Sequence, residues 1–514
     1  MNGSRLRGFG VIVVGIAACI AMSSGVMASD VKRGGTLQMS VDLEPASLDP
    51  IFGNAPGSDR RFYNLYAENL IYQDSEGEFR PMLAESWTFS EDGKSITFEL
   101  RQNVVFHDGT PFDADAVKYN FDRVIDPEVG ARARQFVGNL ESTDVIDEYT
   151  VRVHMKEPSG GFLAVLAIEP GSILSPTAIE ERGESFHRQP VGTGPFVLRS
   201  WTSNRVEAER FEDYWGRDAD GEPLPYLDGV VARVIANTAV KLVELRGGSL
   251  HLGDSIQVRD YDQVERDPDL VLMDTIQGTV QYMAFNVTRP PFDNQDLRAA
   301  VALAINRDAL ERAISQGHGI VLKGLKPPAS LAYSEDVVGH GYEPEKAREH
   351  YAASGHSGTL TLSVIQRDPD TQIAQILQSM LAEVGIELRI EVLERQAWLD
   401  KVLGRTYELG ILRATLPRPD PDISFSTYWG RDARQDFSGI NSPVLHDLID
   451  EARVELDPDR RREIYGKAQQ YINDNFFQTY FLWRPNSEVR RVELVGMDSE
   501  FSGAWRFAEM WLDQ

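Results

Sequence analysis

Two polar segments that follow predicted strands could hold a small charged molecule. The first, Gln366-Arg367, comes directly after the apolar strand predicted at Thr359–Ile365 and before a helix predicted from Asp370. In an open α/β sheet, ligands bind in the crevice at the carboxyl ends of the strands, and the free amides at a helix start favour anions. Arginine at that place suits a carboxylate or phosphate. The alternative is that Arg367 only caps a surface loop.

The second segment, Arg413 to Asp422, follows the strand predicted at Tyr407–Leu412 and therefore lies at the same edge of the sheet. Two aromatic residues just beyond it, Tyr428 and Trp429, are candidates for stacking on a ligand, although aromatic residues in such a place more often belong to the core. The candidate ligand contacts of this segment are Arg413, Thr415, Arg418 and Asp420.

Local sequence patterns predict the elements that position these residues. Apolar and polar residues alternate over Ser95–Arg101, which predicts a half-buried strand. Asp113 is placed to cap the helix that follows it. The strand at Thr359–Ile365, a helix over Asp370–Val384 and a strand over Ile386–Val392 form a βαβ unit, which implies parallel pairing.

A predicted joint between two compact units lies at Tyr282–Phe292. Tyr282–Val287 is an apolar run that is too short for a normal helix and is therefore predicted to be a buried strand. Arg289-Pro290-Pro291 ends it, and Asn306 is placed to cap a later helix. A few residues at the end of an element can absorb a change of angle, so this joint is predicted to be a hinge.

Length and charge restrict the possible classes of protein. The chain has 514 residues, 42% of them hydrophobic, and a formal net charge of −27. This length exceeds what one hydrophobic core usually organises, so we expect two or three domains. Nucleic acids and acidic membranes are bound through clustered Lys and Arg, and the negative charge argues against both as partners.

Residues 1–28 are predicted to be an export signal peptide. They carry two arginines, an apolar stretch over Phe9–Met22 and small residues at the cleavage pattern Val26-Met27-Ala28. Their removal moves the formal charge from −27 to −29, because they contain no acid. We expect a soluble periplasmic protein. The alternative is a lipid anchor on the single cysteine, Cys19, because Ile16-Ala17-Ala18-Cys19 resembles a lipoprotein processing box.

Motifs that would indicate catalysis or a bound metal are absent from the sequence. The nearest histidine pair, His350 and His356, has neither the helical i, i+4 spacing nor a zinc signature. No Gly-x-Ser-x-Gly elbow or phosphate loop occurs, and Gly192-Thr193-Gly194 lacks the remaining glycine of a dinucleotide fingerprint. We therefore predict no catalytic residues, no metal site and no cofactor.

Five separated blocks follow the order found in one known family: Pro81–Trp87, Ile96–Arg101, His107–Phe112, Val191–Phe196 and Met283–Arg307. Together they resemble the family 5 extracellular solute-binding proteins, the peptide- and nickel-binding components of ABC importers. The resemblance implies an α/β, two-lobed periplasmic-binding-protein fold of type II, hinged, with an additional small α/β domain inserted in the first lobe. The expected boundaries are 29–76, 195–287 and 488–514 for lobe I, 77–194 for the inserted domain and 288–487 for lobe II.

The same resemblance bears on the ligand. Peptide-binding members look similar at Gln366-Arg367, where the arginine can meet the ligand's carboxylate. They usually carry an aspartate three residues before an Asp-Pro pair, which neutralises the peptide's ammonium group. Here the pair is Asp420-Pro421, and the corresponding residue is Pro417. We therefore expect blocked or anionic peptides, opine-like conjugates or glycosides more than free peptides. The resemblance also places Asn54 and Arg60 in the cleft.

The expected function is that of a non-enzymatic receptor, monomeric, which captures a small or peptide-like solute between two lobes and delivers it to an ABC permease in the inner membrane. Closure is favoured only by contacts that the ligand makes with both lobes at once. The alternative is a secreted hydrolase or metal-dependent enzyme on the same scaffold, which would turn over a peptide or ester.

Overall fold

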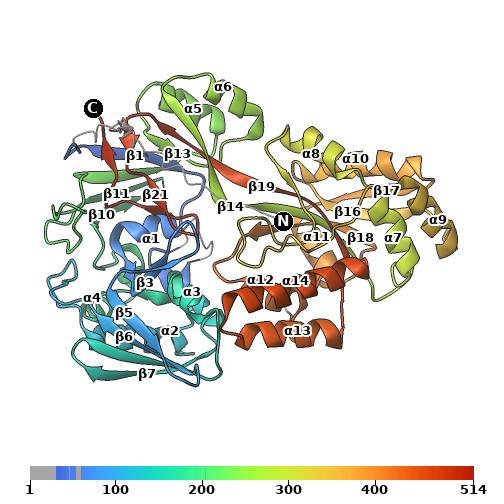
Figure 1. Cartoon of the computed structure of the whole chain (residues 1–514). Helices are drawn as coiled ribbons and strands as arrows, with labels where there is room; N and C mark the ends of the chain where they lie inside the picture. The colour runs from blue at the N-terminus through green and yellow to red at the C-terminus, as the bar shows by residue number, and fades with distance from the viewer. Residues whose placement is uncertain (1–30, 46, 54–58, 203, 434) are drawn as a thin grey trace, which may run out of the picture.

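Two lobes lie side by side and share one long β-sheet (Figure 1). The computed structural model describes residues 31–45, 47–53, 59–202, 204–433 and 435–514, so the predicted signal peptide and Asn54 lie outside it. Its sheet has 11 strands in the order β10 (Phe196–Thr202), β11 (Arg205–Arg210), β12 (Gly229–Val234), β1 (Thr36–Val41), β13 (Leu252–Gly253), β19 (Gln478–Arg491), β14 (Leu270–Phe285), β18 (Leu409–Leu416), β16 (Leu360–Ile365) and β17 (Leu388–Leu393), with β15 (Ile320–Val321) paired to β19.

The antiparallel strands β14 and β19 carry the chain from one lobe to the other (Figure 1). Leu270–Asp274 pairs with β19 inside lobe I, the register breaks, and pairing resumes where Gly278 meets Pro485. Gly278 allows this close approach, because a Cβ there would lie 2.2 Å from the carbonyl oxygen of Arg484. The crossing therefore falls at residues 275–277 of β14 and at residue 486 of β19.

This position corrects the predicted joint at Tyr282–Phe292. Tyr282, Met283 and Phe285 pack into the hydrophobic clusters of lobe II, not lobe I. Strand β18 pairs along the whole of Gly278–Phe285, which ties that part of β14 to lobe II. The expected boundary after Val287 is thus too late, because an apolar run marks burial without indicating which core provides it.

Lobe I holds both ends of the described chain. Two short strands follow directly after its first helix, α1 (Arg60–Tyr66). Helix α1 ends at Tyr66, because Glu68–Asn69 pairs with Ser172–Ile173 and Ile71–Gln73 pairs with Phe79–Pro81. The first of these pairs is β2 (Glu68–Asn69) with β9 (Ser172–Ile173), and the second is β3 (Ile71–Gln73) with β4 (Phe79–Pro81). The other elements of this lobe are α5 (Thr238–Arg246), α6 (Tyr261–Glu265), β20 (Leu494–Val495), β21 (Asp498–Ser499), β22 (Trp505–Arg506) and β23 (Trp511–Leu512).

A small four-stranded antiparallel sheet lies within the predicted insertion 77–194. The predicted alternation is present, because Ile96, Phe98 and Leu100 are buried on one face. Asp113 caps the following helix by accepting from the amide of Ala116. The hydrophobic core of this small domain is continuous with the core of lobe I. The elements are β5 (Ala84–Phe89), β6 (Ser95–Leu100), β8 (Thr150–Met155), β7 (Leu140–Asp147), α2 (Ala114–Ile125), α3 (Phe162–Leu166) and α4 (Pro176–Arg182).

Lobe II contains the predicted βαβ unit, with β16 and β17 parallel and α10 (Asp370–Glu383) between them. Asn306 caps a helix as predicted, by accepting from the amide of Ala309. Strand β18 runs on to Leu416, because Ala414 and Leu416 are buried in the core, so Arg413 and Thr415 lie on a strand and not in a loop. The other helices are α7 (Gln295–Leu303), α8 (Arg307–Ser315), α9 (Pro344–Ser354), α11 (Arg395–Leu403), α12 (Pro421–Trp429), α13 (Pro443–Val454) and α14 (Pro458–Asp474).

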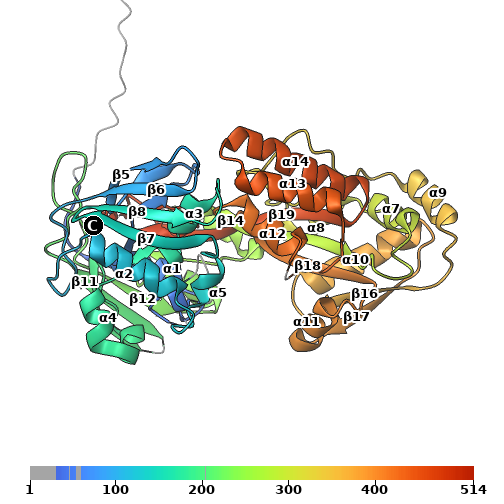
Figure 2. The ribbon, with the colours of Figure 1, turned by 90° about the horizontal axis from the view of Figure 1, so that it is seen from below.

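The lobes also meet away from the crossing strands. Helices α12 and α13 of lobe II lie next to α3 of the small domain in both views (Figures 1 and 2). The amide of Gly160 donates to the carbonyl oxygen of Arg453 across this contact at 3.4 Å. The two lobes are therefore in contact here as well as through the crossing strands. None of the helices in the described ranges is both long and apolar enough to cross a lipid bilayer.

Candidate ligand-binding site between the lobes

A cavity of about 320 Å³ lies where the small domain and lobe I face lobe II. Its lining from the first side includes Gly53, Asp59, Arg132, Gln135, Phe136 and Glu169, and from the second side Arg418, Ile423, Ser424, Thr427, Tyr428 and Gln435. A second compartment of about 570 Å³ adjoins it and shares four of these residues, Gln135, Phe136, Ile423 and Thr427. Both volumes are in the range of small-molecule sites.

Helix α12 provides most of the lobe II wall. Ser424, Thr427 and Tyr428 follow each other at helical spacing on one face, which turns them toward the cavity. The next residue, Trp429, points the other way into the core. The loop before α12 brings Arg418 to the same wall.

Two guanidinium groups reach this cavity from opposite sides without a counter-ion. Arg132, from the short 3-10 helix Arg132–Gln135, and Arg418 form no ion pair or side-chain hydrogen bond within the described part of the chain. Buried carboxyl groups, Asp59 and Glu169, line the same cavity from the lobe I side. The cavity can therefore hold a dipolar molecule whose anionic group contacts both lobes.

Ser424 adds an unused polar group to the lobe II wall. Its side chain is 3% exposed, and its hydroxyl has no hydrogen-bond partner among the residues that are described. A buried hydroxyl without a partner costs free energy. A polar ligand atom in the cavity would relieve this cost.

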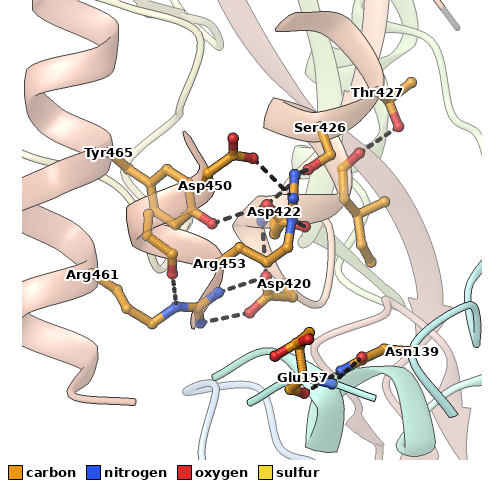
Figure 3. Close-up of polar contacts among 12 residues, drawn as sticks. Asn139, Glu157, Asp420, Asp422, Ser426, Thr427, Asp450, Arg453, Arg461 and Tyr465 are labelled. Carbon is orange, nitrogen blue, oxygen red and sulfur yellow. Dashed lines mark hydrogen bonds and ion pairs between the residues drawn. The ribbon is translucent and has the colours of Figure 1, made fainter. Parts of the chain in front are cut away.

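Two acidic residues that line the larger compartment, Asp420 and Asp422, are engaged in contacts within lobe II (Figure 3). Asp420 caps α12 by accepting from the amide of Asp422, and its two oxygens accept from Arg461 at 2.7 and 2.9 Å. Asp422 accepts from Ser426 at 2.8 Å and lies 3.3 Å from Arg453. Burial raises the pKa of Asp422. Asp420 lines this compartment, and its carboxylate also holds the start of a helix, so its predicted contact with a ligand stays a prediction.

The two predicted anchors Arg367 and Arg413 do come together, on one buried acid. Arg367 donates to Asp370 at 2.7 and 2.9 Å, and Arg413 donates to the other oxygen of Asp370 at 2.7 Å. Burial lowers the pKa of Arg413. Neither arginine lines the cavity described above, nor do Gln366 and Thr415. Their role in ligand binding stays a prediction.

Two further predicted contacts are buried inside the lobes. Arg60 is 2% exposed and forms a two-pronged ion pair with Glu500, so it holds lobe I together and does not face the cleft. Trp429 is 1% exposed and packs edge-on against Phe425, which corrects its predicted stacking on a ligand. Asn54 lies outside the described residues, next to the cavity-lining Gly53.

Sequence reasoning missed Arg132 and Ser424, whereas Tyr428, named together with Trp429 as a candidate for stacking, lines the cavity. The helical spacing of α12 could have separated Tyr428 from Trp429, because Phe425 and Trp429 share the apolar face at four-residue spacing. No local pattern marks Arg132, whose place depends on how the small domain packs against lobe II. Within the described ranges no group of three or more His, Cys, Asp or Glu could hold a metal, and His350 instead contacts Asp296.

Comparison with known proteins agrees with this architecture. The model of the bacterial extracellular solute-binding proteins, family 5 Middle, matches residues 78–436. The glutathione-binding protein GsiB of Escherichia coli (strain K12) is 32% identical over 390 residues, which cover 75% of this chain and 73% of GsiB.

Solved structures show the same two-lobed fold. The periplasmic binding protein DppA from Helicobacter pylori, in complex with the peptide STSA, is similar at a TM-score of 0.77 and 26% identity, covering 94% of this chain and 99% of that one. AgaA from A. tumefacien R10, in complex with agropinic acid, is similar at a TM-score of 0.76 and 24% identity, over 93% and 99% of the two chains. The chain therefore belongs to family 5 of the bacterial extracellular solute-binding proteins, the receptors of ABC importers, and has their type II fold.

Proposed function

We propose that this receptor captures a small, dipolar solute with at least one anionic group in the cavity between its lobes, and releases it unchanged to an ABC permease in the inner membrane. Arg132 and Arg418 carry the proposal, because they bring to one cavity, from opposite sides, two cations that have no ion-pair partner among the described residues. An anion held by both would stabilise only the closed form, which is the condition for ligand-driven closure.

Peptide-like solutes fit the cavity best. The relatives' names include glutathione and a short peptide, both of which carry carboxylates and an ammonium group. Pro417 removes the acid expected on the lobe II wall, but Asp59 of lobe I and Glu169 of the small domain bring carboxyl groups to the cavity from the opposite side. The ammonium group of a peptide would therefore face carboxyl groups even though the expected aspartate is replaced by Pro417. Free peptides remain candidates beside opine-like anions.

The proposed place of action is the periplasm. The predicted signal peptide over residues 1–28 supports export, and Cys19 keeps the lipid-anchored form as the alternative. We propose a monomer. The secreted-hydrolase alternative is not favoured, because the chain belongs to a family of transport receptors.

Mass spectrometry of the solute released by denaturing gently purified protein tests the proposal. We expect a stoichiometric, intact solute with a carboxylate, phosphate or sulfonate group. Calorimetry with glutathione and the peptide STSA then measures affinity, where a dissociation constant near 1 μM corresponds to about −8 kcal/mol. Solutes that are cleaved during binding, or only uncharged and cationic solutes, would contradict the proposal.

A further inference from the structure

Lys326, in the segment after β15, is a buried lysine whose ammonium group has no partner. The residue is 3% exposed, and Nζ makes no hydrogen bond or ion pair with any residue that the structure describes. Nζ lies 4.8 Å from the centre of the Phe425 ring, whose negative face attracts a cation. An unpaired buried ammonium is unfavourable, so this group needs an explanation.

The charged groups around Lys326 belong to three elements of lobe II. Asp420 and Asp422, at the start of α12, attract it, but they are already paired with Arg461 of α14 and Arg453 of α13. Gln469 and Tyr465 of α14 add neutral groups: the backbone amide of Lys326 donates to Oε1 of Gln469, and the ring of Tyr465 stacks on Phe425.

Arg418, in the loop before α12, is the remaining charge that acts on Lys326. Burial is the largest influence on Lys326, the repulsion by Arg418 acts in the same direction, and together they lower its pKa to about 7 against the pull of the two aspartates. Arg418 also lines the cavity. Arg418 therefore links Lys326 to the cavity, and its guanidinium has no counter-ion in the part of the chain that the structure describes.

We propose that Lys326 is a specificity-determining residue that takes up a proton from solvent when an anionic group of the solute binds at Arg418. The anion neutralises Arg418, removes its repulsion of Lys326, and supplies the negative charge that the ammonium lacks. This inference rests on the proposed anion site and identifies how the site favours a carboxylate, phosphate or sulfonate over a neutral group of the same shape. Lys326 acts through Arg418 and the field of the ligand, without contact to the cavity.

The sign of the expected pH dependence follows from the proton uptake. Below about pH 7, Lys326 is charged before binding, and affinity for an anion is highest. Above that pH each binding event must also protonate Lys326, so affinity falls by up to about tenfold per pH unit until the pKa of the complex is reached. A neutral solute shows no such loss, because it does not favour the charged lysine.

Calorimetry with glutathione, at about pH 6 and about pH 8.5 and in buffers of different ionisation enthalpy, tests this inference. Wild-type protein should take up a fraction of a proton at the higher pH, and Lys326→Met should lose both this uptake and the associated fall in affinity. Methionine fills a similar apolar space, and Lys323→Met is the matched control, because Lys323 is exposed and contacts only a backbone carbonyl.

The possible failures are distinguishable. Equal proton uptake in wild type and Lys326→Met would overturn the role of Lys326 and leave capture of an anion intact. Tight binding of glutathione ethyl ester with the same pH dependence as glutathione would point to a group other than the esterified carboxylate at Arg418, whereas pH-independent binding of glutathione itself would overturn the inference. If neither glutathione, STSA nor the co-purified solute binds through an anionic group, the proposed anion site fails and this inference fails with it.

Discussion

Gly161→Ala should specifically destabilise the closed form. Gly161 directly precedes α3 and faces the start of α12, where an added Cβ would lie 2.4 Å from Cγ of Asp420 and 2.6 Å from both of its oxygens. Asp420 cannot move aside without breaking its pair with Arg461. The backbone of Gly161, at φ −100° and ψ 0°, is accessible to alanine, so the small domain itself should fold normally.

The expected size of the effect follows from the overlap. Inserting one methyl group into a packed contact costs about 1–3 kcal/mol. Because the clash exists only when the lobes meet, this cost falls on closure and weakens ligand binding by about 5- to 150-fold. Gly138→Ala is the matched control in the same domain, since no atom lies within 4 Å of a Cβ placed there.

Calorimetry and small-angle X-ray scattering, with and without the co-purified solute, provide the readout. The Gly161→Ala protein should keep the wild-type melting temperature without ligand, bind more weakly, and show a smaller decrease in radius of gyration at subsaturating ligand. Unchanged affinity together with full compaction would show that the contact between Gly161 and Asp420 is not part of the ligand-bound form.

Three other outcomes are expected. Arg418→Ala should weaken an anionic solute at least about tenfold in calorimetry, whereas Arg367→Ala, whose guanidinium is held by Asp370, should change affinity less; the reverse order would return the anion site to the predicted Gln366-Arg367 pair. Gly278→Ala should lower the midpoint of urea unfolding, because its Cβ would meet the carbonyl oxygen of Arg484 at 2.2 Å, and an unchanged midpoint would mean that the strands separate freely at the crossing. Burial lowers the pKa of His107 to about 4, so as pH falls this histidine is protonated in the unfolded chain before it is protonated in the folded protein. The free energy of unfolding should therefore decrease by roughly 3 kcal/mol between about pH 6.5 and about pH 4. In His107→Gln the urea midpoint should depend less on pH over this range, and a pH profile identical to that of the wild type would contradict this expectation.

Helix caps, strand alternation and the βαβ unit could be predicted accurately from the sequence. The cap at Asp113, the alternation over Ser95–Leu100 and the βαβ unit around α10 depend on neighbours within a few residues, and all are present. The family and its two-lobed fold were predicted from five short blocks and are confirmed by the comparisons.

The candidate site was harder to predict because it depends on contacts between distant segments. Asp370 lies three residues after Arg367, a spacing at which a helical turn pairs opposite charges, so the engagement of Arg367 had a local signal. The burial of Arg60 had none, because its partner Glu500 is far along the chain. Arg132 reaches the cavity because the small domain packs against lobe II, and periodicity in the sequence does not predict such packing between distant segments.

The crossing strands have a consequence for the modularity of the receptor. Every residue of the two hydrophobic clusters in lobe II falls between Val280 and Trp483, and the chain enters and leaves this region at the paired residues Gly278 and Pro485. Lobe II is thus a continuous cassette whose two ends are adjacent, the arrangement that tolerates insertion of one domain into another. A cassette taken from another receptor at these two positions would replace the α12 wall of the cavity and leave the small domain, with Arg132, in place.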